Sequence, residues 1–285
     1  MPIDADKVLE VRSPELRVDY GDREVMLYAL GIGFGRDPLD ERELPFVYEK
    51  DLRTLPTLAT TLGWRTDLAG PIGIDFSKVL HVGQSLTLMR PLPAAASVIV
   101  AERVIGAFDK GRDKGALLLI EKTVRDATTG ETICSLVATI LARGDGGFGG
   151  ARDGAPAPHV LPPRPPDIEV ECATRPDQAF LYALSGDRNP LHRDPQYARH
   201  LGFARPVLQG LCTWGIACRA IVTGVCDYTA DRISAFEARL SAPVFPGETI
   251  VTDLWVDGPI VSFRSRVKER DIVALDHGRC ILRFP

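Results

Sequence analysis

The chain has 285 residues, a formal net charge of -4 and a pI near 5.8. Proteins that bind nucleic acid neutralise phosphates with clustered Lys and Arg, so this charge balance argues against that class and we expect no nucleic-acid partner. No apolar run approaches the roughly 18 residues of a membrane span, so we expect no membrane partner either.

The cysteines and the N-terminus indicate a reducing compartment. The segment from Met1 to Asp6 lacks the charged and apolar regions of a signal peptide, and we expect a cytoplasmic protein. A chain of this length does not need a disulfide framework, and it contains no C-x-x-C pair. Reduced, mostly buried thiols are therefore expected at Cys134, Cys172, Cys212, Cys218, Cys226 and Cys280.

A connector divides the chain into two parts. Residues 144–167 include the run Gly146 to Gly150 and the run Pro162 to Pro166, a composition typical of an extended linker and not of a packed element. We therefore expect an N-terminal domain over residues 1–143, a linker over 144–167 and a C-terminal domain over 168–285.

The two halves repeat one pattern in chain order. Each has an apolar segment expected to be helical, which covers Leu55 to Leu62 in the first half and Gly210 to Val222 in the second. Runs rich in β-branched residues follow and predict antiparallel strands. These runs cover residues 83–88, 98–108, 115–124 and 133–141, and then 247–252, 261–267 and 272–282. A helix followed by strands, made twice, indicates a duplication in which each half is α+β, with a sheet over a long apolar helix.

The segment from Tyr182 to Ala198 gathers polar side chains with acid/base chemistry. On one continuous helix Asp187 and His192 would lie about 140° apart. Pro190 disfavours helical geometry at Asn189, so a tight loop is expected in which Asp187, Asn189 and His192 point to one place.

A second feature follows in the same half. Residues 194–202 predict a short helix with Asp194 as its N-cap and Gly202 at its stop. Gly210 then begins the apolar helix, where backbone amides lack intrahelical partners and glycine permits close approach of a ligand oxygen. An acid/base cluster and an oxyanion-binding amide together suggest one site.

At these residues the sequence resembles a known family. Tyr182 to Ala198 resembles the hydratase 2 motif of MaoC-like, (R)-specific enoyl-CoA hydratases. The first half resembles the N-terminal part of the two-hot-dog form found in the hydratase unit of peroxisomal multifunctional enzyme type 2. The segments that carry this second resemblance are Tyr28 to Gly33, Leu55 to Thr57, Arg90 to Pro93, Asp109 to Gly111 and Gly146 to Gly150. The resemblance implies an α+β double hot-dog fold, with two antiparallel sheets joined into one and each wrapped on a long central helix.

The resemblance also implies an activity and roles for residues. It implies reversible hydration of a trans-2-enoyl-CoA to an (R)-3-hydroxyacyl-CoA, with Asp187 and His192 activating water, Asn189 positioning the site and the Gly210 amide holding the thioester oxygen. Only the second half would be catalytic, while the degenerate first half makes room for a bulky acyl group. The acyl-CoA thioester is the expected partner, no metal or redox cofactor is expected, and we expect a homodimer whose sheets meet side by side. Gln209 departs from the His that family members often carry before this glycine, which leaves open how the loop is braced.

Two other functions remain open from the sequence. A hot-dog acyl-CoA thioesterase would use a carboxylate to direct water at the carbonyl carbon instead of C3. A non-catalytic acyl-CoA-binding protein would retain the fold without the reaction.

At several residues a purely structural role competes with a functional one. Gly31 to Gly35 is a poor dinucleotide loop because Pro38 follows where a helix should run. Asp187, His192, Asp194 and His200 fit no familiar metal spacing, and Cys212 is expected to be a core thiol and not a nucleophile. The turn with Lys110, Arg112 and Lys114 either contacts the phosphates of CoA or is a solvated hairpin tip.

Overall fold

All the strands that the structure describes belong to one antiparallel sheet. The computed structural model describes residues 3–65 and 68–283, so Met1 and Pro2 of the N-terminal segment discussed above lie outside it. Ten strands pair in the order β1-β3-β4-β5-β2-β7-β10-β9-β8-β6. Their bounds are β1 Leu16–Tyr20, β2 Val79–Leu88, β3 Ala96–Asp109, β4 Ala116–Asp126, β5 Thr132–Ala142, β6 Ile168–Ala173, β7 Ile233–Leu240, β8 Thr249–Asp257, β9 Ile260–Val267 and β10 Ile272–Leu282.

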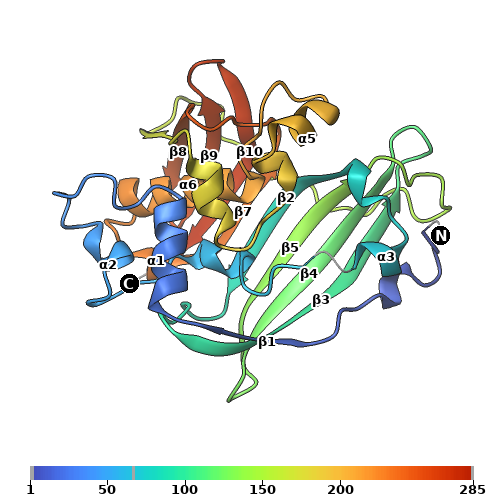
Figure 1. Ribbon diagram of the computed structural model, residues 1–285, viewed down its shortest axis with the longest axis horizontal. Coiled ribbons are helices and arrows are strands. Elements are labelled where there is room, and N and C mark those ends of the chain that lie inside the picture. The colour runs from blue at the N-terminus through green and yellow to red at the C-terminus, as the bar shows by residue number, and fades with distance from the viewer. Residues whose placement is uncertain (1–2, 66–67, 284–285) are drawn as a thin grey trace.

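The two halves meet edge to edge inside this sheet. Strand β2 of the first half pairs antiparallel with β7 of the second, from Gly83 opposite Arg239 to Thr87 opposite Ala235. Figure 1 shows the green strands of the first half continuing into the orange and red strands of the second. This joint means that neither half leaves a central strand edge exposed to solvent.

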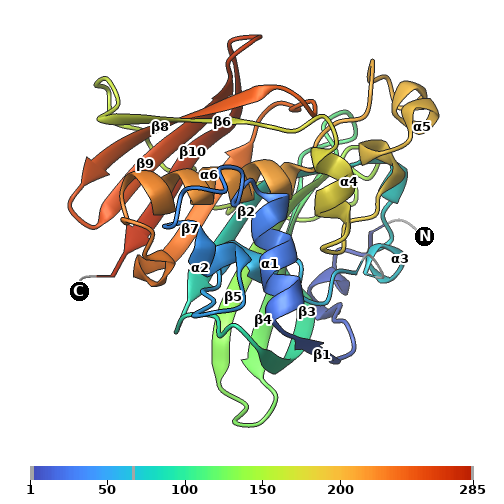
Figure 2. The same ribbon diagram turned by 60° about the vertical axis from the view of Figure 1, so that its left-hand side comes forward.

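The second half is wrapped on one long helix, α6 (Gly210–Gly224), as expected. Its side chains are apolar around nearly the whole circumference, which is typical of a helix enclosed on all sides. Trp214 lies 4.7 Å from Phe236 on β7, and Phe236 stacks at 4.8 Å on Phe263 of β9. Figure 2 shows α1 (Asp22–Gly31), α4 (Gln178–Ala183) and α6 on the same face of the sheet.

The prediction of a long helix in the first half is wrong. The segment forms only a 3-10 helix, η2 (Pro56–Thr60), before the chain turns away at Gly63, whose φ is +60°. The hydroxyls of Thr60 and Thr61 donate to the carbonyls of Thr57 and Leu58, three residues back. Such local bonds compete with an α-helical ladder, and β-branched side chains lower helix propensity further.

The remaining helices are short. They are α2 (Leu44–Val47), α3 (Ala69–Ile72), α5 (Pro195–His200), η1 (Val8–Glu10), η3 (Phe76–Lys78), η4 (Pro190–His192) and η5 (Ala230–Arg232). Residues 144–167, all of which the structure describes, contain no helix or strand. The first part of this segment is bonded to the end of β3, where the Asp109 carboxylate accepts the amides of Gly147 and Gly149. The second part contacts β8 and β9, where His159 Nε2 is 2.8 Å from Ser262 Oγ and Trp255 Nε1 donates to the Arg164 carbonyl.

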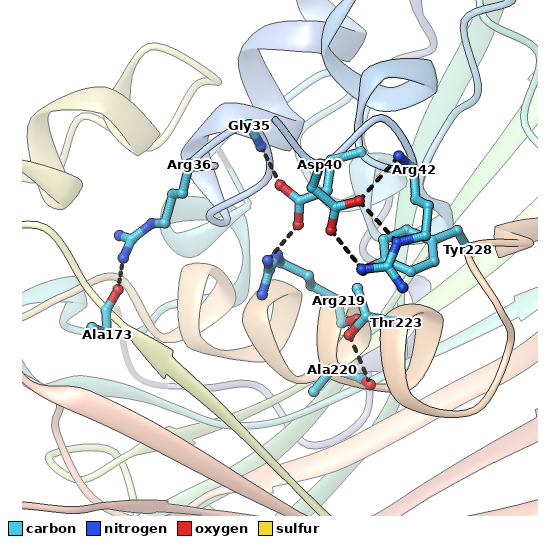
Figure 3. Close-up of polar contacts among 10 residues, drawn as sticks. Gly35, Arg36, Asp40, Arg42, Ala173, Arg219, Ala220, Thr223 and Tyr228 are labelled. Carbon is cyan, nitrogen blue, oxygen red and sulfur yellow. Dashed lines mark hydrogen bonds and ion pairs between the residues drawn. The ribbon is translucent and has the colours of Figure 1, made fainter. Parts of the chain in front are cut away.

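A loop of the first half also binds the central helix of the second. Figure 3 shows Arg219 of α6 reaching the loop between α1 and α2, where its guanidinium lies 2.5 Å from a carboxylate oxygen of buried Glu43. The other Glu43 oxygen accepts the Gly35 amide, and Arg36 donates to the Ala173 carbonyl at the end of β6. Because both partners of the Glu43 pair are largely shielded from water, removal of either would leave a buried charge unpaired.

Candidate active site

The expected catalytic loop lies between α4 and α5. The helix α4 ends at Ala183, and η4 begins at Pro190, so the segment is not one continuous helix, as predicted from the proline. Asp187 Oδ1 accepts the amide of Asn189 at 3.1 Å, and Asn189 Oδ1 accepts the amide of Leu191 at 3.0 Å. These short-range bonds hold the loop in one conformation.

Asp187 and His192 face one another. Asp187 Oδ2 lies 3.6 Å from His192 Nε2, and each side chain is 11% exposed. His192 Nδ1 lies 2.8 Å from the Val207 carbonyl oxygen. Since a carbonyl can only accept, Nδ1 carries the hydrogen and Nε2 presents its lone pair toward Asp187.

Burial sets the protonation state of the imidazole. It lowers the pKa of His192, while the Asp187 carboxylate and the hydrogen bond to Val207 oppose that shift without cancelling it. His192 is therefore neutral at neutral pH. The site then offers two acceptors, a carboxylate oxygen and an imidazole nitrogen, spaced so that one water molecule can donate a hydrogen bond to each.

Gly210 is the first residue of α6, as expected. In the part of the chain that the structure describes, its amide donates no hydrogen bond. A Cβ at this position would lie 2.2 Å from Leu240 Cδ2, so a larger residue would have to displace that side chain. The helix dipole is positive here, and a free N–H at such a terminus suits an anionic oxygen.

Asn189 caps η4 with its side-chain oxygen, which leaves its amide nitrogen with no hydrogen-bond partner among the described residues. The sequence did not single out Val207, whose carbonyl fixes the His192 tautomer. No side-chain pattern identifies a residue that acts through its backbone oxygen, and only the fold brings positions 192 and 207 together.

The structure also decides some of the competing interpretations. Cys212 is fully buried, burial raises the pKa of its thiol well above the ordinary range, and its Sγ donates to the Gly31 carbonyl. All six cysteines are free and buried, which confirms the expectation of core thiols. Asp194 caps α5 through the amides of Gln196 and Tyr197, as predicted.

Across residues 3–65 and 68–283 no group of three or more His, Cys, Asp or Glu side chains is arranged to hold a metal ion. Lys110 and Lys114 line a surface cavity of about 450 Å³ together with Arg152, Leu141 and the carboxylates of Asp109 and Asp153. No helix in the described ranges is long and apolar enough to cross a membrane.

Comparisons with known proteins cover nearly the whole chain. Residues 159–277 match the family described as MaoC like domain, and residues 18–144 match the MFE-2 hydratase 2 N-terminal domain. The chain is 40% identical to the peroxisomal enoyl-CoA hydratase 2 of Arabidopsis thaliana, over 95% of this chain and 93% of that protein.

Solved structures agree on the fold. A MaoC-like dehydratase from Phytophthora capsici matches with a TM-score of 0.88 at 32% identity, over 99% of this chain and all of that one. A conserved hypothetical protein of Mycobacterium tuberculosis, described as having a double hotdog fold, matches with a TM-score of 0.59 at 17% identity, over 99% of each chain. The expected double hot-dog fold is confirmed.

Proposed function

Because the chain belongs to the MaoC-like hydratase 2 family, we propose that it reversibly hydrates a trans-2-enoyl-CoA to an (R)-3-hydroxyacyl-CoA. The observation that carries this proposal is the pair of acceptors at 3.6 Å, Asp187 Oδ2 and His192 Nε2. Water has a pKa near 15.7 and is a poor nucleophile, so its addition to C3 needs such a base.

The reaction divides between the two parts of the site. The Asp187 and His192 pair takes one proton from water as the oxygen bonds to C3, and the pair returns a proton to C2. Negative charge develops meanwhile on the thioester oxygen, which the Gly210 amide stabilises. Asn189 positions the bound water through its amide nitrogen, and the reverse sequence of steps dehydrates the hydroxyacyl-CoA.

The pocket for the acyl group is proposed to lie on the side of the first half. A five-residue 3-10 helix occupies the position of a long central helix there, and a shorter element leaves more volume over the sheet. Turnover measured along a series of straight and branched enoyl-CoAs tests this part of the proposal.

Incubation with crotonyl-CoA separates the proposed reaction from its rivals. Hydration removes the absorbance of the conjugated double bond and releases no free thiol. A thioesterase would release free CoA, and a protein that only binds acyl-CoA would leave the substrate unchanged.

We further propose that no metal or redox cofactor takes part. Hydration changes no oxidation state, and residues of the chain are already assigned to the activation of water and to the stabilisation of the thioester oxygen. Full activity after dialysis against a chelator would agree with this, and activity restored only by added metal would contradict it.

We also propose a cytoplasmic location, which the six reduced thiols support. Fractionation of the source cells tests it.

A homodimer is proposed as well. The side-by-side joining of two sheets that we expected between protomers is already made within one chain by β2 and β7, so we place the dimer contact on another surface. Large apolar side chains are exposed on α1, α2, α4 and beside them, namely Leu30, Leu44, Tyr48, Phe180 and Leu184. Exposed apolar groups on neighbouring helices favour association. A monomeric mass in solution at micromolar concentration would contradict the dimer.

A further inference from the structure

Gln209, which precedes the proposed oxyanion amide, is completely buried. Its Nε2 donates a hydrogen bond of 3.0 Å to the Ala179 carbonyl of α4. Its Oε1 has no hydrogen-bond partner among the described residues. A buried amide that is only half satisfied is costly, and such costs are tolerated most often where a residue serves a site.

The segment from Val207 to Gly210 connects the two parts of the site. The Val207 carbonyl accepts from His192, and the Leu208 amide donates to the Val244 carbonyl. The next residue is Gln209, whose side chain is bonded to α4, the helix that leads directly into the Asp187 loop. The N-terminal end of α6 is thus held both to the His192 imidazole and to α4, the helix that precedes Asp187.

We propose that Gln209 is a positioning residue that holds the Gly210 amide at a fixed place relative to the Asp187 and His192 pair. This inference rests on the oxyanion role proposed for Gly210. A donor to a developing oxyanion must lie about 2.7–3.1 Å from that oxygen, so a small displacement of the first turn of α6 weakens transition-state binding more than substrate binding.

Gln178 provides a matched control. It is also a completely buried glutamine, and its Nε2 donates to the Gly31 carbonyl at 2.5 Å. It ties α4 to the first half of the chain, and its Oε1 accepts hydrogen bonds from the Arg36 guanidinium and the Arg175 amide. None of its hydrogen bonds joins it to the segment before Gly210. If Gln209 only filled the core, substitution by Met at position 209 and at position 178 would change the carbonyl stretch and kcat alike.

The test compares Gln209→Met and Gln178→Met, which keep side-chain length and remove the donor. Butyryl-CoA, which has no double bond to hydrate, is bound to each protein, and isotope-edited infrared spectroscopy measures its thioester carbonyl stretch. In the wild type we expect a shift to lower frequency, caused by the Gly210 amide. Gln209→Met should lose most of this shift and lose about 10- to 100-fold in kcat, with KM changed less than about threefold.

The remaining outcomes also decide the matter. Gln178→Met should keep the carbonyl shift, and Gln209→His, which restores a ring N–H, should recover it. An unchanged shift in Gln209→Met would overturn the positioning role. If that variant does not fold, the same measurement on Gln209→Leu, which also lacks the donor, takes its place: an unchanged shift overturns the role and loss of the shift supports it. Absence of any shift in the wild type would instead refute the oxyanion role of Gly210, and with it the premise of the inference.

Discussion

Replacing Asp187 by Asn removes a charge with little change in shape. Asn Oδ1 can still accept the Asn189 amide that Asp187 Oδ1 accepts at 3.1 Å, so the loop conformation is expected to persist. The new side chain cannot take a proton from water, so the acid/base pair loses its carboxylate and only the His192 nitrogen remains as a base.

The expected loss of rate has two contributions. Removal of a positioned general base costs about 10²- to 10⁴-fold in rate, or about 3–5 kcal/mol at ~1.36 kcal/mol for each tenfold change. The carboxylate also favours the imidazolium form, since Asp187 Oδ2 lies 3.6 Å from His192 Nε2. Two unit charges at that spacing attract by about 4–5 kcal/mol before desolvation costs, at an effective dielectric constant of about 20. Without that attraction, His192 is harder to protonate and serves less well as the acid that returns a proton to C2.

The assay is hydration of a trans-2-enoyl-CoA, followed as loss of the conjugated absorbance, alongside thermal unfolding. Asp194→Asn is the control, because Asn caps a helix as well as Asp and α5 should keep its cap. We expect that control to retain the wild-type rate. If Asp187→Asn folds normally and keeps more than a tenth of the wild-type rate, the assignment of Asp187 to the acid/base pair is refuted.

Three further predictions follow from single contacts. The pKa of His192 is lowered, so kcat/KM should be level above about pH 6.5 and should fall at lower pH as the imidazole is protonated. The free energy of unfolding should also decrease below about pH 6.5, because the unfolded chain binds the proton more readily than the folded one. A pH-rate profile with its acid limb above pH 7 would contradict this. Gly215→Ala places a Cβ 2.8 Å from the Tyr28 hydroxyl and should lower the free energy of unfolding by about 1–3 kcal/mol in denaturant unfolding. Gly70→Ala is the control, because its Cβ meets nothing within 4 Å and the free energy of unfolding should not decrease. If the cavity beside Lys110 and Lys114 holds CoA phosphates, Lys114→Ala should raise KM several-fold for CoA esters and leave KM for pantetheine esters unchanged. An unchanged KM for both kinds of ester would assign Lys114 to a solvated hairpin tip.

The parts of the site that lie close together in the sequence were predictable. The Asp187 to His192 loop follows from the helix-breaking Pro190, and Gly210 follows from the start of an apolar run. The pairing of Nδ1 with the Val207 carbonyl is long-range and backbone-mediated, and no pattern of side chains encodes it.

The fold was predictable to a similar degree. Long, apolar strands such as β3 and β5 were recognised, while β1, β6 and β7 were not among the expected strands. β1 and β6 are short edge strands with charged side chains, including Glu169 and Glu171, and they lack a strong apolar alternation. The helix expected from the apolar segment after Leu55 is shortened by bonds between its own threonines and the backbone, a local competition that apolar periodicity does not report.

Hydration in water labelled with oxygen-18 tests the central claim most directly. After incubation of the wild-type protein with a trans-2-enoyl-CoA, the account predicts an intact thioester that carries the label on a hydroxyl at C3, with the (R) configuration. A label found in a free carboxylic acid, or a hydroxyl of (S) configuration, would contradict it.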